Sequence, residues 1–497
     1  MRASQNTLTF VRGIVLIAAG LLIIFSLELA LDLVSGGYPL TRITTFSVAD
    51  ARHINNIFNR NLNQLMAIVF TTVGLAVPLT ANLYSLKFLE FFIQDRVNAV
   101  ALLFVVFADV ANSWAGYAIR DNLIPVIQLN TVLVLTVLSF ALVFPYLYYV
   151  FRFLHPNTLL TRLEHSLAAD LAAARRRPGP RRAEVAANLE HVANIALRSV
   201  ERGDRNTAIE SVQTLNRALR HYWTQKPALP AAWFEADPDF FLGFSSSVVD
   251  DLNAHRSWVE MKVYNLLQQI VGAAIGRMPE LTRTAAKALR HLSLEPAARQ
   301  DPALRELATA FFNTLLRQAL NRRDARAVFT VFDQYRLFAE TINGEQPELG
   351  LEIAYYFQYY GQVARETGQN FLAEAAAYDL GGLVRMAWEA GAANRAELLE
   401  RFLHYDTQTR PPLKGVKKAQ ALLASFFLQT GEAAPAAAIQ AHWAGLETAF
   451  IQQVRDELLF VRRETYWEIT ERRLNLEYVP PEQRPHLQRF FDGVLAA

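Results

Sequence analysis

The stretch from Leu123 to Phe153 decides the class of this protein, because it reads LIPVIQLNTVLVLTVLSFALVFPYLYYVFRF and contains a single charged residue. Three stretches of the same kind precede it, at Val11–Val34, Leu65–Leu86 and Val97–Ala118. Each reaches the roughly 20 apolar residues that a helix needs to cross about 30 Å of hydrocarbon. Lipid offers the backbone no hydrogen-bond partner, so we expect four transmembrane helices within residues 1–155.

The short connections predict how these helices are oriented. The first stretch is too long for a cleavable signal peptide and lacks its processing site, so we expect it to remain. Lys and Arg cluster at the N-terminus and after the second and fourth stretches, at Arg2, Arg12, Lys87, Arg96, Arg152 and Arg162. The positive-inside rule then places both termini in the cytoplasm of a multi-pass inner-membrane protein. Arg42, Arg52 and Arg60 in the first outer connection weaken this bias without reversing it.

Composition limits the classes of function. The chain has no cysteine, which excludes disulfides, thiolate metal sites and a cysteine nucleophile. Its net charge is only +2, whereas nucleic-acid binding requires a concentrated basic surface, so we expect no nucleic-acid partner.

Two local patterns organise the chain between its apolar stretches and its polar tail. Ser47-Val48-Ala49-Asp50 has the form of a capping box and opens an apolar pattern of helical period, which predicts a helix at 47–63 in the first outer loop. Pro178-Gly179-Pro180 within an Arg-rich run predicts a hinge, so residues 156–182 are interpreted as a membrane exit and linker.

The remaining residues, 183–497, form a cytoplasmic helical-hairpin domain in this interpretation. Four short polar segments each separate two amphipathic helical runs, as the turn of a helical hairpin does; they are residues 202–208, 321–327, 367–373 and 430–434. Small residues after such turns let paired helices approach closely. Their irregular spacing favours a degenerate α-solenoid of tetratricopeptide-like hairpins, with an irregular helical bundle as the alternative.

Five segments resemble a bacterial family of predicted membrane proteins, domain of unknown function 2254. They are Ser47–Arg60, Phe70–Thr80, Ser85–Arg96, Phe151–His155 and His191–Leu219, of which Ser85–Arg96 is the most specific. The resemblance covers roughly residues 45–220. It implies a helix that enters the second span, a turn ending in Asp-Arg, a membrane exit after the fourth span, and cytoplasmic helices that flank a turn.

The chain also departs from the family pattern. Lys87 stands where the family usually has Arg, and Asp204–Ala208 replaces an Asn-Asp-Pro form. The strand-rich cytoplasmic segment of the family is missing, and the helical tail after Pro227 has no counterpart. The resemblance implies topology rather than an activity.

No motif predicts an enzyme. The chain contains no Gly-rich phosphate loop, no His-Glu-x-x-His pair and no nucleophile elbow. Its ten histidines are scattered without the spacing of a ligand set, so we expect no metal and no cofactor.

Polar residues at membrane depth are the strongest candidates for function. Asp109, with Asn112 one turn further on, lies within the third span, where a carboxylate is costly unless it faces protein, water or a partner. One interpretation places it on a pathway. The other has Asp109 hydrogen-bonded to Thr131 or Asn130 and holding two helices together.

Two acidic residues at the outer end of the first span allow two interpretations as well. Glu28 and Asp32 are four residues apart, which places them on one side of a helix. They either sit at the membrane interface or form a ring that attracts cations.

A polar side of the second span adds to these candidates. Thr71, Gly74, Pro78, Asn82 and Ser85 recur at roughly heptad spacing. Such a side lines a hydrated pore, or it packs against a neighbouring helix in the way that small residues do in membranes. In an oligomer both can hold.

Five arginines follow the last span: Arg175, Arg176, Arg177, Arg181 and Arg182. They are candidates for binding anionic lipid headgroups. The alternative is a solvated linker that obeys the positive-inside rule.

These observations favour a homo-oligomeric, channel-like membrane protein. Four spans form too thin a bundle to enclose a pathway, so a pore has to assemble between subunits, gated or held together by the cytoplasmic helices. The alternative is a membrane-anchored scaffold or sensor whose solenoid binds a protein partner. A transporter ranks third, because the spans contain no inverted repeat. The expected partners are membrane lipids, further copies of the chain and a cytoplasmic protein.

Overall fold

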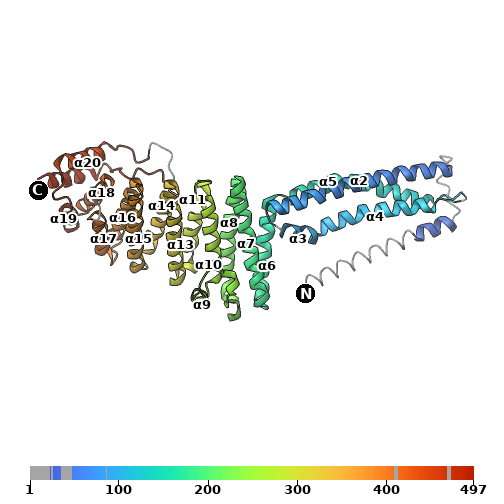
Figure 1. Ribbon diagram of the computed structural model, residues 1–497, viewed down its shortest axis with the longest axis horizontal. Coiled ribbons are helices and arrows are strands. Elements are labelled where there is room, and N and C mark those ends of the chain that lie inside the picture. The colour runs from blue at the N-terminus through green and yellow to red at the C-terminus, as the bar shows by residue number, and fades with distance from the viewer. Residues whose placement is uncertain are drawn as a thin grey trace. The chain divides into compact units, whose positions relative to one another are not determined.

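Helices dominate the structure of this protein. The computed structural model describes residue 23 and residues 26–34, 47–85, 87–121, 123–407, 412–466 and 472–496 (Figure 1). In these ranges the regular elements are helices, accompanied by two isolated β-bridges at Arg120–Leu123 and Thr465–Leu474. The all-α prediction is confirmed. The chain divides into two compact units, an N-terminal unit of residues 1–159 and a C-terminal unit of residues 160–497.

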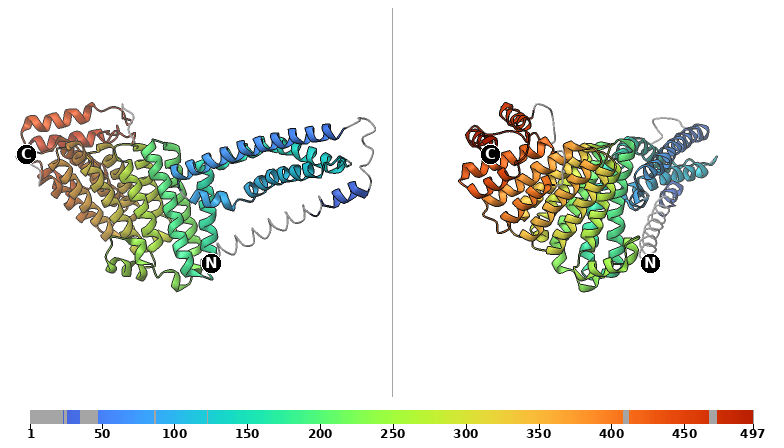
Figure 2. Two further views of the ribbon diagram at one scale, coloured as in Figure 1. Left: turned by 45° about the vertical axis from the view of Figure 1, so that its right-hand side comes forward. Right: turned by 60° about the vertical axis from the view of Figure 1, so that its left-hand side comes forward.

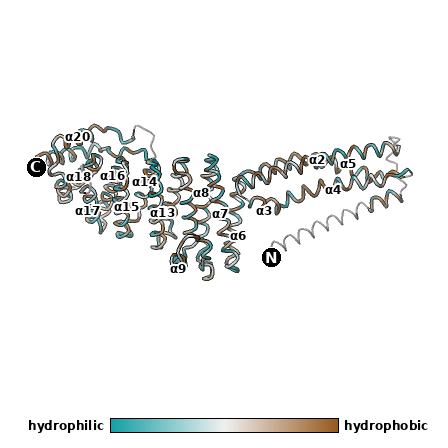
Figure 3. The backbone as a smooth tube through the Cα atoms, in the orientation of Figure 1, coloured by the Kyte–Doolittle hydropathy of each residue, from teal (hydrophilic) through white to brown (hydrophobic). Residues whose placement is uncertain are grey.

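The N-terminal unit is a bundle of long apolar helices. Its helices after residue 47 are α2 (Val48–Leu83), α3 (Lys87–Gln94), α4 (Arg96–Ala118) and α5 (Val126–Phe153). Each of α2, α4 and α5 packs on the other two, and each is long and apolar enough to cross a membrane. Figure 3 shows their hydrophobic colouring. The first apolar stretch, Val11–Val34, lies mostly outside the described residues, so three of the four expected spans are seen as helices of spanning length.

Helix α2 begins at the predicted capping box. Ser47 Oγ accepts a hydrogen bond from Asp50 N at 3.2 Å, and Ser47 N donates to Asp50 Oδ2 at 3.0 Å. These bonds satisfy backbone donors that a helix start leaves without partners. The expected outer-loop helix at 47–63 and the second apolar stretch are one continuous helix of 36 residues, about 54 Å long.

A short amphipathic helix, α3, connects α2 to α4. Phe88 and Phe92 of α3 are buried edge-to-face against Phe153 of α5, with ring centroids 5.3 and 5.4 Å apart. Asp95 then caps α4 by accepting from Val97 N and Asn98 N, and it also accepts from the Tyr149 hydroxyl at 2.8 Å. The segment with the most specific family resemblance therefore closes one end of the bundle.

The C-terminal unit is built from two parallel rows of helices. The first row contains α7 (Pro178–Arg202), α10 (Trp258–Ala274), α13 (Pro302–Asn321), α15 (Pro347–Glu366) and α17 (Arg395–Thr407). The second row contains α8 (Arg205–Gln225), α11 (Pro279–Ser293), α14 (Ala325–Ile342), α16 (Asn370–Glu389) and α18 (Lys414–Thr430). Each helix packs on its neighbours in its own row and on its partner in the other row, as Figure 2 shows. This arrangement is the solenoid that the turns predicted.

The remaining helices flank or connect these rows. They are α6 (Pro156–Ala174), α9 (Ser246–Ala254), α12 (Pro296–Arg299), α19 (Ala433–Ala441), α20 (Thr448–Phe460), α21 (Arg484–Ala496) and three short 3-10 helices at Lys226–Ala228, Ala231–Trp233 and Pro238–Phe241. Helix α18 contacts α19, α20 and α21, so these three helices cover the last hairpin.

The predicted turns lie where consecutive helices meet. Gly203 ends α7 with φ of 72°, a left-handed conformation that favours glycine, and Asp204 then caps α8 by accepting from Thr207 N. The turn between α13 and α14 repeats the cap with Asp324. Gly276, with φ of 78°, marks a further turn between α10 and α11 that the sequence analysis did not single out.

The expected linker at 156–182 is instead helical. Helix α6 occupies most of it, and α7 starts at Pro178, which was predicted to be a hinge. Proline fits the first turn of a helix, because the N–H it lacks has no intrahelical partner there. Only residues 175–177 separate the two helices.

One non-helical segment lies on the second row. Between α20 and α21 the described chain is non-helical, and we call residues 461–466 and 472–483 the return segment. Its two parts pair with each other through an antiparallel bridge between Thr465 and Leu474, and turns follow at 475–478 and 480–483. It reaches back to α14, α16 and α18, where its side chains form hydrogen bonds and ion pairs.

Candidate functional site

The two acidic residues of the first apolar stretch hold it against α5. Asp32 is fully buried, and its carboxylate accepts from Ile127 N at 3.2 Å and Gln128 N at 3.4 Å. These donors belong to the first turn of α5, where a negative charge also stabilises the helix dipole. Glu28 Oε1 accepts from the Thr131 hydroxyl at 3.2 Å. The pair therefore makes contacts within the bundle that neither the interface nor the cation-ring interpretation had included.

Asp109 does not form the predicted bond to Thr131, which donates to Glu28. Asp109 Oδ1 is enclosed and has no hydrogen-bond partner among the described residues. The same holds for both side-chain polar atoms of Asn112, which is fully buried on α4. Buried polar atoms without partners are exceptions in folded proteins, because each costs about 1–3 kcal/mol.

A third polar side chain reaches this region from α2. Asn55 is 3% exposed, and its Oδ1 also lacks a partner in the described part of the chain. A Cβ atom added to Gly116 of α4 would lie 2.6 Å from Asn55 Nδ2. Gly116 thus allows the close approach of Asn55 to α4, one turn beyond Asn112. The sequence analysis had not singled out Asn55.

The polar side of α2 faces away from its own bundle. Thr71, Gly74, Pro78 and Asn82 are exposed in the N-terminal unit, whereas the alternate side with Val69, Val73, Val77 and Ala81 is buried. Ser85 does not share their exposure: it is 4% exposed and lies beyond the end of α2, and its hydroxyl accepts from Lys87 N. Helical spacing no longer applies there.

The five arginines after the last span do not act as one set. Arg181 is ion-paired with Asp170, at 2.5 Å, and with Glu184. Arg175 donates to Gln225 Oε1 at 2.6 Å. Arg176 and Arg177 are exposed between α6 and α7, and Arg182 is half-buried. Only part of the predicted headgroup site is therefore open.

Asp170 is the buried partner in this group. Its carboxylate also accepts from Asn188 Nδ2 at 3.0 Å. The pKa of Asp170 is raised to about 6, mainly by burial and also by the neighbouring Glu184, while Arg181 opposes the increase. Arg181 thus serves the packing of α6 against α7.

In the C-terminal unit, the return segment is fixed to the second row by Arg472. This side chain is 2% exposed and forms a bidentate pair with Asp379 of α16, at 2.5 and 2.9 Å. It also donates to the Phe329 carbonyl of α14 at 3.1 Å and lies 4.0 Å from the Phe329 ring centroid. One arginine of a non-helical segment therefore occupies a built site between two helices.

A second anchor of the return segment carries the opposite charge. Both carboxylate oxygens of Glu477 accept from Lys418 Nζ of α18, at 2.9 and 2.8 Å. The Tyr378 hydroxyl of α16 donates to the same carboxylate at 3.4 Å. A cavity of about 870 Å³ beside these residues is lined by aromatic side chains that include Phe329 and Phe371.

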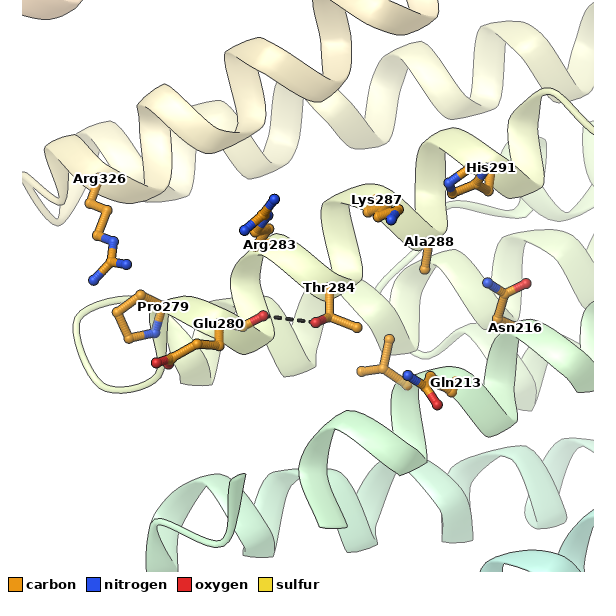
Figure 4. Close-up of a pocket in the computed structure, with 11 residues that line it drawn as sticks. Gln213, Asn216, Pro279, Glu280, Arg283, Thr284, Lys287, Ala288, His291 and Arg326 are labelled. Carbon is orange, nitrogen blue, oxygen red and sulfur yellow. Dashed lines mark hydrogen bonds between the residues drawn. The ribbon is translucent and has the colours of Figure 1, made fainter. Parts of the chain in front are cut away.

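The second row also has a cleft between α8 and α11, and Arg326 lines both this cleft and the cavity beside the return segment. The cleft measures about 450 Å³ and is lined by Arg283, Lys287 and His291 of α11, by Gln213 and Asn216 of α8, and by Arg326 of α14 (Figure 4). Burial lowers the pKa of His291, and so do the positive charges of Arg290, Lys287 and Arg220. The cleft is therefore basic.

Part of this site had a signal in the sequence. Arg283, Lys287 and His291 recur every fourth residue, a spacing that aligns them on one side of a helix. The return segment had none, because Arg472 and Asp379 are 93 residues apart. Within the described residues, no group of three or more His, Cys, Asp or Glu side chains is placed to hold a metal.

Comparison with known proteins gives one structural similarity. No family model matches the chain, and no curated protein matches it. Among solved structures, the chain is similar to a "Circular tandem repeat protein with novel repeat topology and enhanced subunit contact surfaces". The two share 12% sequence identity, the match covers 90% of this chain and 97% of that chain, and the TM-score is 0.34.

Proposed function

We propose that the N-terminal unit anchors this protein in a membrane and that the second row of the solenoid binds extended segments of a protein partner. The single observation that carries this proposal is the return segment. A non-helical stretch of the chain itself lies on that row, held through the side chains of Arg472 and Glu477. A surface that accepts side chains of one non-helical segment has the donors, acceptors and pockets to accept those of another.

The membrane part of the proposal rests on which side chains face outward. Leu75, Leu79 and Phe144 are 69%, 61% and 78% exposed on α2 and α5. Contiguous apolar surface of this kind is rare on soluble proteins and normal on helices that face lipid. Lys87, Arg96 and Arg152 lie near the bundle end that Asp95 and Tyr149 close, so we place this end in the cytoplasm.

The test is binding in trans of a synthetic peptide with the sequence of residues 461–483. Full-length protein in nanodiscs would be compared with Arg472→Ala/Glu477→Ala, which loosens the chain's own segment. We expect the labelled peptide to bind this variant at least about tenfold more tightly than the unaltered protein, because the competing intramolecular segment has a high effective concentration.

The control is Glu306→Ala/Arg317→Ala, two exposed residues of α13 in the first row. It should bind the peptide as weakly as the unaltered protein does. Because Arg472 is buried, Glu477→Gln provides a milder second variant, and circular dichroism checks that each variant is folded. No binding to either loosened, folded variant would contradict the proposal.

A specific observation favours a second function, an oligomeric pore. Thr71, Pro78 and Asn82 present polar or small groups on the exposed side of α2. We propose as the alternative that copies of the chain assemble with this side toward a hydrated axis. The buried polar groups of Asp109 and Asn112 support it, because such groups inside apolar helices mark ion or substrate paths.

Conductance separates the two functions. Reconstituted protein should conduct in planar bilayers, and Asn82→Leu should lower the unitary conductance, whereas Phe144→Ala, at an exposed apolar position of α5, should leave it unchanged. Currents equal to those of protein-free bilayers across voltage and membrane tension would rule out the pore.

A further inference from the structure

The basic cleft between α8 and α11 has no role in the proposed membrane anchor or in holding the return segment. Arg283 and Lys287 are exposed there, and neither has an acidic partner among the described residues. The one carboxylate in the lining, Glu280, is paired with Arg205 at 3.0 Å. The cleft thus carries uncompensated positive charge.

The spacing of the charges indicates the shape of the ligand. Residues four apart on α11 rise about 6 Å along the helix, so Arg283, Lys287 and His291 form a line of two equal steps. Alternate side chains of an extended peptide are about 6.6 Å apart. A strand that runs along α11 therefore brings its alternate side chains opposite successive residues of this line.

The other wall of the cleft suits a peptide backbone. Gln213 and Asn216 of α8 lie on the opposite side, where their amide groups can both donate and accept (Figure 4). Thr284 has its hydroxyl engaged with the Glu280 carbonyl at 2.8 Å, so it contributes its methyl group to the floor. Polar amides on one side and cations on the other fit a main chain with acidic side chains.

The same row already binds an acidic residue in this way. Glu477, in a turn of the return segment, is held by Lys418 of α18 and Tyr378 of α16. Lys418 stands in the second row as Lys287 does, three hairpins further along. The chain thus already contains a contact between a lysine of the second row and a carboxylate, which is the contact that we expect in the open cleft.

We propose that this cleft binds an acidic, extended segment of a partner protein, with carboxylates at alternate positions paired to Arg283 and Lys287. The inference rests on the proposed function, because it names the chemical class of the segment that the second row takes from a partner.

The experiment measures fluorescence anisotropy of a labelled ten-residue peptide with Glu at alternate positions and Ser between them. Full-length protein in nanodiscs of zwitterionic lipid is titrated, and the same peptide with Gln in place of Glu serves as the neutral probe. We expect Arg283→Glu/Lys287→Glu to weaken binding of the acidic peptide at least about tenfold, because two attractive contacts become repulsive.

The matched control reverses two exposed arginines of the first row, Arg317→Glu/Arg322→Glu, and so changes the net charge equally. It should change the affinity less than about twofold, since exposed charges beyond a Debye length of about 8 Å are screened. Equal losses in the two variants would overturn the site in favour of bulk charge. Displacement of the peptide by millimolar inorganic phosphate, or tighter binding of a ten-nucleotide single-stranded RNA, would also overturn it.

The two proposals fail in different ways. If the 461–483 peptide binds the loosened variant but the acidic peptide binds nothing, the second row takes extended segments and the cleft assignment is wrong. If neither peptide binds, the proposed function falls with the inference.

Discussion

The two units of this protein differ in their most deeply buried polar side chains and in their exposed surfaces, although each unit also holds buried polar atoms without a partner among the described residues. In the C-terminal unit, Arg472 and Asp379 are almost fully buried and pair with one another through two bonds. In the N-terminal unit, Asn112 is fully buried with neither polar atom bonded, and Asp109 Oδ1 is enclosed without a partner among the described residues. The first unit also exposes large apolar side chains such as Leu75. The comparison teaches that the solenoid joins distant parts of its chain through a buried ion pair, whereas the bundle packs through apolar side chains and also presents such side chains outward.

The largest effect is expected when one member of the Arg472–Asp379 pair is removed. Arg472→Ala leaves the buried Asp379 with Arg336 alone, 3.4 Å away, so it should lower the free energy of unfolding of the solenoid by about 2–3 kcal/mol, less than the loss expected for a carboxylate without any cation. Denaturant unfolding of the full-length protein in detergent measures this. Arg322→Ala, on the exposed surface, should cost less than about 0.5 kcal/mol. Equal effects would show that the pair is not integral to the solenoid.

A second prediction concerns the pH dependence of the solenoid. The folded protein holds Asp170 with its pKa raised to about 6 from an ordinary 3.8, so the folded state binds this proton more tightly than the unfolded state. Stability from this group is therefore highest below about pH 4 and declines as the pH rises to 6, by at most about 3 kcal/mol. Asp170→Asn should remove this decline in unfolding curves measured between pH 4 and 7. A slope that persists in the variant would assign it to other groups.

Two glycines of the N-terminal unit test how closely its helices pack, with smaller expected changes in stability. Gly116→Ala places a Cβ 2.6 Å from Asn55 Nδ2, so we expect a loss of about 1–2 kcal/mol that Asn55→Ala partly restores. Gly74→Ala, with nothing within 4 Å, should be neutral or slightly stabilising. Melting temperatures in detergent check both. A Gly116→Ala variant as stable as Gly74→Ala would mean that Asn55 does not lie against α4.

The smallest effect is expected on the exposed side of α2. Asn82→Leu should change the stability of detergent-solubilised single subunits by less than about 0.5 kcal/mol, because α2 buries its other side. Its effect belongs to assembly instead, so mass photometry should detect a shift in oligomeric state if the second spans meet. An unchanged distribution would leave α2 as an anchor facing lipid.

The sequence predicted the structural features that depend on residues close together in the chain. Ser47 and Asp50, three residues apart, form the capping box that marks the start of α2. Gly203 marks the end of α7, because few other residues adopt its left-handed conformation. The all-helical class and the hairpin turns follow from such local patterns. The family resemblance of Ser85–Arg96 stays a prediction.

What the sequence did not predict depends on contacts between distant residues. Asp32 accepts a hydrogen bond from Ile127 N of α5, 95 residues further along the chain. Nothing in the sequence around this carboxylate, near the end of an apolar stretch, indicates that partner. Pro178 carries a strong turn signal, yet the same ring geometry fits the first turn of a helix, and packing of α6 on α7 decides between them. The return segment has no periodic pattern at all, so its place on the second row emerges only from the fold.

The return segment changes how the solenoid comes apart. A stack of hairpins in which each unit contacts only its neighbours can fray from either end, one hairpin at a time. Here Arg472 and Glu477 connect chain beyond α20 to α14, α16 and α18, so the last hairpins cannot detach while those contacts hold. These contacts prevent fraying from the C-terminal end. The helices from α14 onward should therefore exchange their amide hydrogens as one cooperative block, and gradual loss of protection should be confined to the opposite end.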